Sequence, residues 1–554
     1  MTAPDIRHSS HQGGMMTTTK SGGQALVAAL AAHGVDTVFG IPGTHNLAVY
    51  AALAGSGITH VLPRHEQGAG YAADGYARVS GKPGVCITTT GPAILNAAAA
   101  AAQAYSDSVP VLFVAPGLPL GHPSNGNGYL HELKNQRGAM DSIVGHSQRV
   151  TSVEEIPLAV AQCFAAMTTG RARPAYLEIP LELLDAVAMV TPVAPVQSGA
   201  ATPTADGVHR AAALIAAAER PLVIAGGGSS AAATELRDFA EVLGAPVITT
   251  ANGKGVLSEQ HPLSLGAGLH HPTVAELVSD SDLVVAVGTE LAPSDLWYGP
   301  LQAEGRLIRI DIDPTGVSTN AQPTVALVGD SAETLRALNS RLEGMSGDRG
   351  GPQRAAAWRS RLRADAAREG ARYVTLCASL DKALDDDAIL AGDSAMACYY
   401  GALSNLPLHQ PRSFLYPTGV GTLGYGLPAS IGAKVAAPDR QVVAMLGDGG
   451  VMFTIAELAG AAQARLAIPV IIVDNGGYGE IRNEMADRRD AVHAVELGTP
   501  DFPALARALG CHAVALDSPA QVGDAVAEAF GSDRPTLIHV REIDEADLPR
   551  PTPH

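Results

Sequence analysis

Short apolar runs, separated by glycine-rich turns and helical segments, recur along the chain and are clearest near its end. Val442–Leu446 is an apolar run typical of a buried strand, and it stops at the turn Gly447–Gly450. Ile455–Leu466 is rich in Ala with Glu, Gln and Arg, which favours a helix. Pro469–Val473 is a second apolar, β-branched run, and the turn Asp474–Gly477 follows it. The order strand, turn, helix, strand predicts a parallel β-sheet with crossover helices.

A similar pattern occupies the first third of the chain. A strand at Val85–Thr89 enters a turn at Gly91, an Ala-rich helix covers Ile94–Ala104, and the strand Val109–Ala115 follows. Two domains of one architecture explain the similarity, and chance likeness between two βαβ units is the alternative. Between them, Pro221–Ala225 runs into a further glycine turn and starts another α/β segment. The predicted fold class is therefore α/β, with three doubly wound parallel-sheet domains.

Pro- and Gly-rich stretches mark the expected domain boundaries. Thr191–Thr204 and Gly344–Gln353 have the composition of linkers. The polar N-terminus lacks the apolar core of a signal peptide and is typical of a disordered extension. The expected divisions are residues 1–20 as this extension, 21–190, 205–345 and 365–545 as the three domains, and 546–554 as a loose tail.

Composition narrows the possible functions. The 554 residues carry a formal net charge of −18, which argues against a nucleic-acid partner because such a partner requires basic patches. The five cysteines form no CxxC pair and their number is odd, which favours a reducing, cytoplasmic location over a disulfide framework. No stretch reaches the roughly 18 apolar residues of a transmembrane helix, so we expect no membrane partner.

Asp448 and Asn475 are the first candidates for chemistry. Each follows one of two predicted neighbouring strands, so both fall at the carboxyl edge of the sheet, where open α/β sheets bind ligands. A carboxylate, an amide oxygen and free backbone carbonyls suit Mg²⁺, which also keeps room for water and phosphates. The alternative is that these Asp-Gly and Asn-Gly sequences are ordinary turns.

The spacing of the two turns resembles a family signature. Gly-Asp-Gly, followed one helix and one strand later by Asn, resembles the thiamine-diphosphate (ThDP) motif of the acetohydroxyacid synthase and 2-oxo-acid decarboxylase superfamily. The resemblance implies that Asp448, Asn475 and the carbonyl of Gly477 hold Mg²⁺ against the cofactor's diphosphate. Asp474 stands where the family usually has Asn, at a position that is not a ligand. The resemblance further implies a pyrimidine-binding domain first, a central domain, and a diphosphate-binding domain last.

Glu66 is the expected catalytic acid and base. It lies in RHEQGAGYAADGYARVSGKPG, which resembles the first-domain motif whose Glu hydrogen-bonds the aminopyrimidine ring of ThDP. We expect an apolar cavity to keep this carboxyl partly protonated, so that it can pass a proton to the ring. Without the resemblance, a carboxylate in the first turn of a helix is explained by the helix dipole.

Further stretches supply cofactor contacts by the same resemblance. Gly419–Gly424 satisfies GxGxxG, but no clear strand precedes it, which weakens a nicotinamide interpretation. The longer string GVGTLGYGLPASIGAK resembles acetohydroxyacid synthases, in which the residue matching Gly421 accepts from the 4′-amino group and that matching Leu423 supports the bent cofactor. The turn Gly392–Ser394 suits a phosphate, with helix capping as the alternative. The expected cofactor-binding residues are Gly91, Ser394, Ala395, Gly421, Leu423, Gly447, Asp448, Gly449, Gly450, Asn475 and Tyr478.

Two loops of the first domain are candidates for the substrate side. The polar loop Gly126–Gln136 is long enough to reach a substrate, and its His131 and Gln136 are expected in the cavity wall and in the catalytic set. A solvated loop histidine is the alternative. His45 and Asn46 occupy positions that line the active site in several relatives.

Glu480 completes the expected catalytic set. It follows the magnesium loop, where relatives place substrate-side residues, although a solvated helix face is the alternative for it and its charged neighbours Arg482, Glu484 and Asp487. The strings GYLHELKNQ and GYGEIRNEM resemble most closely the members that decarboxylate 5-guanidino-2-oxopentanoate. A carboxylate such as Glu480 or Glu484 would pair bidentately with a guanidinium group.

The resemblance implies a ThDP- and Mg²⁺-dependent decarboxylation of a 2-oxo acid to an aldehyde. An acetolactate-type carboligase is one alternative, and a catalytically silent ThDP-binding protein is an alternative of another class. Gly91-Pro92-Ala93, where relatives commonly have Gly-Pro-Gly, departs from the pattern and affects the expected specificity.

Two more expectations concern the cofactor of the central domain and the oligomeric state. Gly226–Ser230 has the composition to receive a dinucleotide, but Gly288–Asp295 lacks the Arg-Phe-Asp string of flavin-binding synthases, so we expect no FAD. In this superfamily the cofactor lies between the first domain of one subunit and the last domain of another. We therefore expect a homodimer or homotetramer, with Glu66 reaching across.

Overall fold

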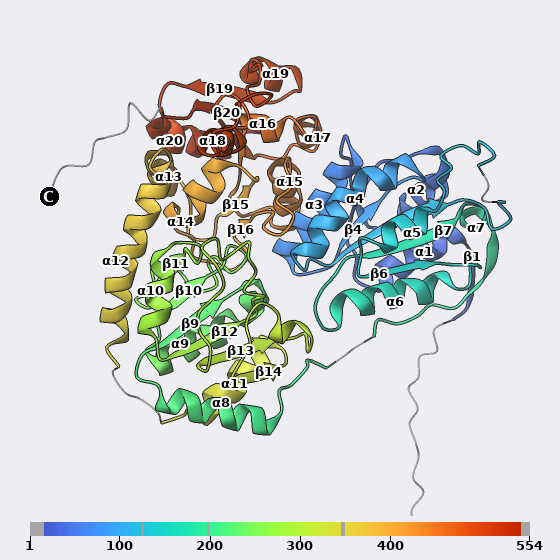
Figure 1. Ribbon diagram of the computed structural model, residues 1–554. Coiled ribbons are helices and arrows are strands. Elements are labelled where there is room, and N and C mark those ends of the chain that lie inside the picture. The colour runs from blue at the N-terminus through green and yellow to red at the C-terminus, as the bar shows by residue number, and fades with distance from the viewer. Residues whose placement is uncertain (1–15, 124–125, 197–198, 345–348, 544–554) are drawn as a thin grey trace, which may run out of the picture.

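The computed structural model describes residues 16–123, 126–196, 199–344 and 349–543. These residues form three six-stranded sheets and one two-stranded antiparallel ribbon. All neighbours within the six-stranded sheets run parallel, and each sheet lies in its own lobe between helices (Figure 1). The predicted fold class is confirmed. None of the described helices combines the length and the apolar character needed to cross a membrane.

The first sheet has the order β3-β2-β4-β5-β7-β6. The elements of this domain are β1 (Thr18–Ser21), α1 (Gly22–Ala32), β2 (Thr37–Gly40), η1 (Thr44–Asn46), α2 (Leu47–Leu53), β3 (Thr59–Val61), α3 (Glu66–Ser80), β4 (Gly84–Ile87), α4 (Pro92–Ser106), β5 (Val111–Gly117), α5 (Gln136–Asp141), β6 (His146–Arg149), α6 (Ile156–Thr168), β7 (Ala175–Pro180), α7 (Leu181–Asp185) and β8 (Val187–Val190).

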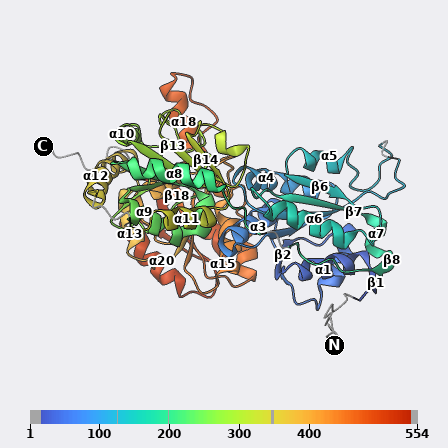
Figure 2. The same cartoon turned by 90° about the horizontal axis from the view of Figure 1, so that it is seen from below.

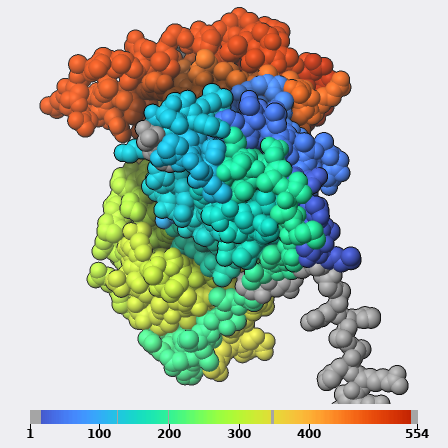
Figure 3. All heavy atoms as spheres, turned by 90° about the vertical axis from the view of Figure 1, so that its right-hand side faces the viewer, coloured from blue at the N-terminus to red at the C-terminus, as the bar shows by residue number. Residues whose placement is uncertain are grey.

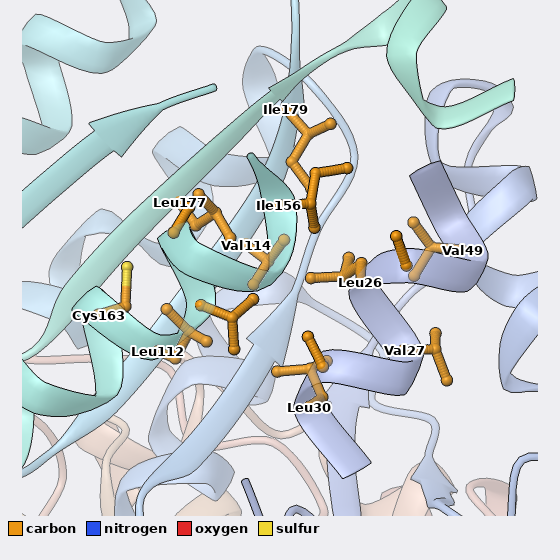
Figure 4. Packing of buried hydrophobic residues seen from close by; sticks show 14 of the residues in the cluster. Leu26, Val27, Leu30, Val49, Leu112, Val114, Ile156, Cys163, Leu177 and Ile179 are labelled. Atoms are coloured by element: carbon orange, nitrogen blue, oxygen red, sulfur yellow. The ribbon is translucent and has the colours of Figure 1, made fainter. Parts of the chain in front are cut away.

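The core of this domain shows why its strands are apolar without interruption. Leu112 of β5 and Leu177 of β7 pack with residues of α1 and α6, including Leu26 (Figure 4). The intervening residues Phe113 and Tyr176 are buried in a different cluster, with α3 and α4. Because successive strand residues point to opposite faces, a sheet covered on both faces requires apolar residues at nearly every position.

The third sheet has the order β16-β15-β17-β18-β20-β19. Counted within each sheet, this is the same order, 2-1-3-4-6-5, as in the first sheet. The predicted common architecture of the first and last domains is confirmed. The elements are α13 (Val374–Asp381), β15 (Ile389–Gly392), the π-helix η4 (Ala397–Ala402), α14 (Leu403–Asn405), β16 (Phe414–Leu415), α15 (Gly426–Ala436), β17 (Val442–Gly447), α16 (Asp448–Val451), α17 (Glu457–Gln463), β18 (Pro469–Asp474), α18 (Gly479–Asp487), α19 (Phe502–Ala508), β19 (His512–Leu516), η5 (Pro519–Gln521), α20 (Val522–Phe530) and β20 (Thr536–Arg541).

The central sheet has the order β11-β10-β9-β12-β13-β14, which is 3-2-1-4-5-6 within the sheet. This is the order of doubly wound dinucleotide-binding folds. The elements are α8 (Ala205–Ala217), β9 (Pro221–Ala225), η2 (Gly227–Ala232), α9 (Ala233–Leu243), β10 (Val247–Thr249), β11 (Ser264–Ala267), α10 (Thr273–Asp280), β12 (Leu283–Val287), β13 (Leu307–Asp311), η3 (Gly316–Ser318), β14 (Val325–Val328), α11 (Ser331–Arg341) and α12 (Gly351–Glu369).

Two boundary predictions need correction. Thr18–Lys20, expected in the disordered extension, belong to β1, which pairs with β8. A ribbon with one polar strand has no apolar periodicity, so hydropathy does not reveal it, although threonine favours strands. Gly351–Gln353, expected in a linker, begin α12. Pro352 is tolerated in the first helical turn because its missing N–H has no partner there. Residues 1–15, 345–348 and the tail from 544 lie outside the described residues.

The first domain packs on the third through α3 and α15 (Figure 2), and the space-filling view shows the two domains in contact (Figure 3). A Cβ atom on Gly75 would lie 2.2 Å from the carbonyl oxygen of Ala429, and one on Gly432 would lie 1.9 Å from that of Ala72. Only glycine permits this close approach of the two helices. Arg78 of α3 donates to Asn252, so a side chain of this helix also contacts the central domain.

Candidate active site

The carboxyl ends of β15 and β17 frame the crevice on which the site is built. The strand order reverses here, because β16 lies outside β15 whereas β18 continues beyond β17. Open parallel sheets bind ligands at such a switch point. The turn Gly392–Ser394 follows β15, and Gly447 and Asp448 follow β17. Two of the predicted stretches therefore meet at one edge of the sheet.

Three oxygen atoms converge at the ends of β17 and β18. The amide oxygen of Asn475 lies 2.9 Å from the carbonyl oxygen of Gly477 and 3.2 Å from Oδ1 of Asp448. Three acceptors this close repel one another unless a cation lies among them or the amide turns over and donates its N–H groups. Hard oxygen donors of this kind are the ligands that Mg²⁺ prefers. The three predicted metal ligands are thus brought together in an arrangement that fits a magnesium ion.

Burial and a neighbouring carboxylate raise the pKa of Asp448. The side chain is buried, and desolvation is the larger cause, followed by the charge of Asp474. Asp474 stands where the family usually has Asn, and its side chain has other partners than the three oxygens. It accepts from the backbone N–H of Gly476 at 3.0 Å and lies 3.0 Å from Nε2 of His539. It therefore fixes the turn and adds negative charge next to the three oxygens, which a divalent cation would offset.

Glu542 orients Asn475, and nothing in the sequence pattern pointed to it. The Asn475 amide nitrogen donates to Oε2 of Glu542 at 3.5 Å, which directs the amide oxygen toward Asp448 and Gly477. Glu542 is itself held by Arg372 and by the hydroxyl of Tyr373. Groups that orient metal ligands from behind tune the affinity of the site. Glu542 follows β20, which pairs with β18, so only the sheet pairing brings it here.

Asp393 links the phosphate turn to the loop that carries Gly421. The side chain is fully buried and accepts backbone N–H groups from Ser394 and Gly424 at 3.0 Å and from Tyr425 at 3.1 Å. Its burial raises its pKa to about 6. Sequence reasoning treated this residue only as a possible helix cap. Because this one buried carboxylate accepts from three amides in two loops, it fixes the distance between the two loops.

The predicted glycine-rich residues are packed closely around Asp393. A Cβ atom on Gly450 would lie 2.6 Å from Oδ2 of Asp393, and one on Gly449 would lie 3.0 Å from the ring of Tyr478. Gly421 has a φ of 65°, and Leu423 and Ala395 are half-buried beside the crevice. A side chain at Gly449 or Gly450 would displace these neighbours. The stretches expected to hold the diphosphate and the pyrimidine therefore share one crevice.

Glu66 is the first residue of α3 and is half-buried in the single chain. Its Oε2 accepts from the Asn96 side chain at 3.0 Å. The turn before it is held from the third domain, because Glu457 accepts the backbone N–H groups of Arg64 and His65 at 3.0 Å. Burial raises the pKa of Glu457 to about 7. Neither Asn96 nor Glu457 had a sequence signal, since both lie within Ala-rich helices.

Gln136 is fully engaged beneath the Gly91 turn. Its Oε1 accepts the backbone N–H of Gly91 at 2.7 Å, and its Nε2 donates to the Pro116 carbonyl and the Tyr176 hydroxyl, both at 2.8 Å. Gly91 has a φ of 69°, and a Cβ atom there would lie 2.4 Å from the carbonyl oxygen of His131. These contacts leave Gln136 no free polar group for a substrate, so it positions Gly91.

His45 and His131 face each other next to this turn. Their rings lie 5.1 Å apart, and Nδ1 of His45 is 3.1 Å from Oγ1 of Thr90. Burial, and then the proximity of His131, lower the pKa of His45. Nδ1 of His131 is buried and has no hydrogen-bond partner among the described residues. Asn46 differs from the expectation, because it is buried and uses its side chain to hold the backbone of Gly43 and Ile41.

The first turn of α18 places Glu480 beside η4. Its Oε1 accepts from the Tyr400 hydroxyl at 2.8 Å, and Arg482 donates to the Asn475 carbonyl at 3.4 Å. Glu484 and Asp487 are exposed on the outer face of the helix. Of these four charged residues, only Glu480 and Arg482 therefore reach the crevice side.

Comparisons with known proteins match all three domains. The profiles of the thiamine pyrophosphate enzyme N-terminal TPP binding domain, central domain and C-terminal TPP binding domain match residues 20–138, 208–338 and 395–540. A probable 2-ketoarginine decarboxylase, AruI, of Pseudomonas aeruginosa is 42% identical, covering 94% of each chain. A probable acetolactate synthase large subunit of Methanocaldococcus jannaschii is 33% identical over 95% of this chain and 92% of its own. The acetolactate synthase large subunit of Parasynechococcus marenigrum is 35% identical over 94% and 88%.

Proposed function

This chain belongs to the thiamine pyrophosphate enzyme family, and from that premise we propose that it decarboxylates a 2-oxo acid without oxidation and releases the aldehyde. The observation that carries the proposal is the convergence of oxygens from Asp448, Asn475 and Gly477 beside the loop of Gly421. This is the arrangement that a magnesium diphosphate requires at a switch point.

The residues of the crevice have separate roles in holding the cofactor. Asp448, Asn475 and the Gly477 carbonyl would bind Mg²⁺, and Ser394 and Ala395 would contact the diphosphate. Leu423 and the Gly421 carbonyl would hold the ring system. When bound, ThDP supplies the carbon nucleophile and the electron sink that no side chain provides.

Side chains of the first domain would carry out the proton transfers. Glu66 would give and take the proton at the aminopyrimidine, with Asn96 fixing one of its oxygens. Gly91, held by Gln136, would shape the cavity above the reacting carbon. Next to the Gly91 turn, His45 and His131 would bind the substrate carboxylate or protonate the product; the lowered pKa of His45 favours a neutral ring, which keeps one N–H donor.

The substrate we propose is 5-guanidino-2-oxopentanoate, which is 2-ketoarginine. The name of the relative from Pseudomonas aeruginosa supports this choice, as do the strings around Gln136 and Glu480. Glu480 accepts from Tyr400 on the crevice side of α18, which adds negative charge near a cationic substrate.

Acetolactate-type ligation is the second candidate, because two of the relatives carry that name. An assay of the purified holoenzyme with pyruvate, benzoylformate and 5-guanidino-2-oxopentanoate separates the two. Release of CO₂ with equimolar guanidino aldehyde is the expected result. Acetolactate from pyruvate as the dominant product would reject decarboxylation in favour of ligation.

We further propose that two copies of the chain complete each site. Exposed apolar side chains lie in the loops next to the crevice, including Val420 at 51% and Phe453 at 52% exposure. Exposed apolar residues that cluster near a site are typical of protein interfaces. A homodimer or homotetramer would cover them and would bring Glu66 of a second copy over the cofactor.

The central domain is proposed to function without FAD. At its switch point the Gly226 N–H donates to the Val287 carbonyl and the Gly228 N–H to that of Gly288. These amides are therefore used for packing two loops together instead of facing a pyrophosphate, which supports the proposal. All five cysteines are free and buried, which is consistent with the proposed cytoplasmic location.

A further inference from the structure

A cavity of about 180 Å³ lies between the central and third domains. The central domain contributes Thr249, Asp295 and Trp297 to its lining, and the third domain contributes Tyr399, Tyr416 and Thr418. Tyr399 belongs to the π-helix that follows Ala395, and Thr418 precedes Gly421 by three positions. The cavity therefore adjoins the loops proposed to hold the cofactor. Single-turn π-helical segments often occur at functional sites.

Two hydroxyl groups and a carboxylate of this cavity can accept hydrogen bonds from a ligand. Oγ1 of Thr249 and Oγ1 of Thr418 are buried and have no hydrogen-bond partner among the described residues. Asp295 takes part in none of the ion pairs that the described residues form with one another, and burial raises its pKa to about 7. The Asp295 carboxylate is half-buried and has a backbone donor in Ala251, so it keeps acceptor capacity that a cationic ligand can use.

Aromatic rings form the other walls. Trp297 and Tyr399 meet edge to face with ring centres 6.4 Å apart, and Tyr400 lies behind Tyr399 at 4.5 Å. His270, the basic residue at the cavity, hydrogen-bonds Glu369 at 3.1 Å. Neither Lys nor Arg is among the described lining residues, so an anionic ligand would find no counter-charge.

We propose that this cavity binds the guanidinium end of the substrate, with Asp295 as its counter-ion and Trp297 and Tyr399 as its aromatic walls. A guanidinium group has only N–H donors and a flat face, so it matches a carboxylate, two hydroxyl acceptors and aromatic rings at once. Rings favour a cation over their faces, most strongly tryptophan. The inference rests on the proposed substrate and adds the residues that select it.

Selectivity tests the inference. The ratio of kcat/KM for 5-guanidino-2-oxopentanoate to that for 2-oxohexanoate, whose side chain is uncharged, is measured in wild type, Asp295→Asn and Asp238→Asn. The loss of a charge-assisted hydrogen bond should lower the ratio about 10- to 100-fold in Asp295→Asn, mainly through KM. Asp238, exposed on α9, should leave the ratio at the wild-type value. An unchanged ratio in Asp295→Asn would overturn the inference.

A binding measurement distinguishes failure of this inference from failure of the proposed function. The chain contains two tryptophans, so Trp358→Phe leaves Trp297 as the only tryptophan. Ethylguanidine should change its fluorescence saturably, and Asp295→Asn should abolish the response. Turnover of other 2-oxo acids with an intact ethylguanidine response would reject the substrate but keep the cation site. No response to ethylguanidine, or one matched by acetate, would reject the site even if the guanidino substrate is turned over.

Discussion

Asp107, which caps the C-terminal end of α4, accepts the backbone N–H of Gly419 at 2.9 Å. Its other carboxylate oxygen accepts from Arg78 at 2.7 Å and from the backbone N–H of Thr418 at 3.2 Å. A side chain of the first domain therefore holds the third-domain loop that leads to Gly421. The position of the proposed pyrimidine-binding loop depends on contact between domains and not on the loop sequence alone.

Replacement of Asp107 by Ala should weaken ThDP binding by about 10-fold or more, because two loop amides and the Arg78 guanidinium lose their acceptor. Asp107→Asn keeps one acceptor oxygen and should have a smaller effect. Titration of apoenzyme with ThDP at saturating Mg²⁺ measures the change. Asp185→Ala, at an exposed acid of the same domain, is the control and should bind ThDP like wild type. Equal ThDP affinity in Asp107→Ala and the control would remove Asp107 from this role.

The sequence predicted Asp448 and Asn475 because their proximity is local to one βαβ unit. Each follows a strand, and adjacent parallel strands end at one edge. Glu542 and Asp393 could not be predicted in the same way. Glu542 reaches Asn475 only because β20 pairs with β18, and Asp393 acquires its role from the amides of Gly424 and Tyr425, which lie 31 and 32 positions later. Such partnerships depend on strand order and loop packing, which apolar periodicity does not encode.

Loss of Glu542 should weaken metal binding without removing a ligand. In Glu542→Ala the Asn475 amide loses the acceptor that orients it, so the Mg²⁺ concentration for half-maximal activity should rise about 10- to 100-fold. The measurement is a Mg²⁺ titration after treatment with a chelator. Asp448→Asn removes a ligand and should have the larger effect. Asp524→Asn, on the exposed face of α20, should titrate like wild type. A Glu542→Ala enzyme with normal Mg²⁺ dependence would show that Asn475 is oriented by other contacts.

Mixing two inactive variants should test whether subunits share a site. Glu66→Gln and Asp448→Ala each remove one half of the proposed machinery. If Glu66 acts on the cofactor of a second copy, a mixed dimer has one intact site, and random reassembly should restore about a quarter of wild-type activity. Each variant subjected alone to the same dissociation and reassembly is the control. Activity that stays at the level of the separate variants after verified subunit exchange would place both residues in one chain's site.

Gln136 and Asn46 illustrate a second limit of sequence reasoning. Both are polar residues next to candidate loops, which favoured roles in a substrate cavity. In the structure each satisfies backbone groups of its own domain from a buried position. Buried polar groups must be hydrogen-bonded, so these side chains pair with backbone groups of the fold and are not available to a substrate. His131 is distinguished from them by its unpartnered Nδ1.

Glu457 should make the stability of the protein fall as pH rises. Its pKa is about 7 in the folded chain because of burial, against an ordinary value of 4.5. Below pH 4.5 the carboxyl is protonated in both states. Between pH 4.5 and 7 the folded state holds a proton that the unfolded chain has lost, so the free energy of unfolding declines over this window. Above pH 7 the folded protein carries a buried carboxylate at a cost on the order of 3 kcal/mol.

Glu457→Gln keeps one oxygen for the N–H groups of Arg64 and His65 but cannot ionise, so it should lack this loss. The difference in thermal unfolding midpoint between Glu457→Gln and wild type is the quantity to measure, because other titrating groups cancel in it. It should shift in favour of the variant as the pH rises from 5 to 8. Glu528→Gln, at an exposed position of α20, should show no such trend. Parallel pH profiles for Glu457→Gln and wild type would mean that Glu457 is already ionised in the folded protein near pH 5, with Arg64 and its backbone donors compensating the charge fully.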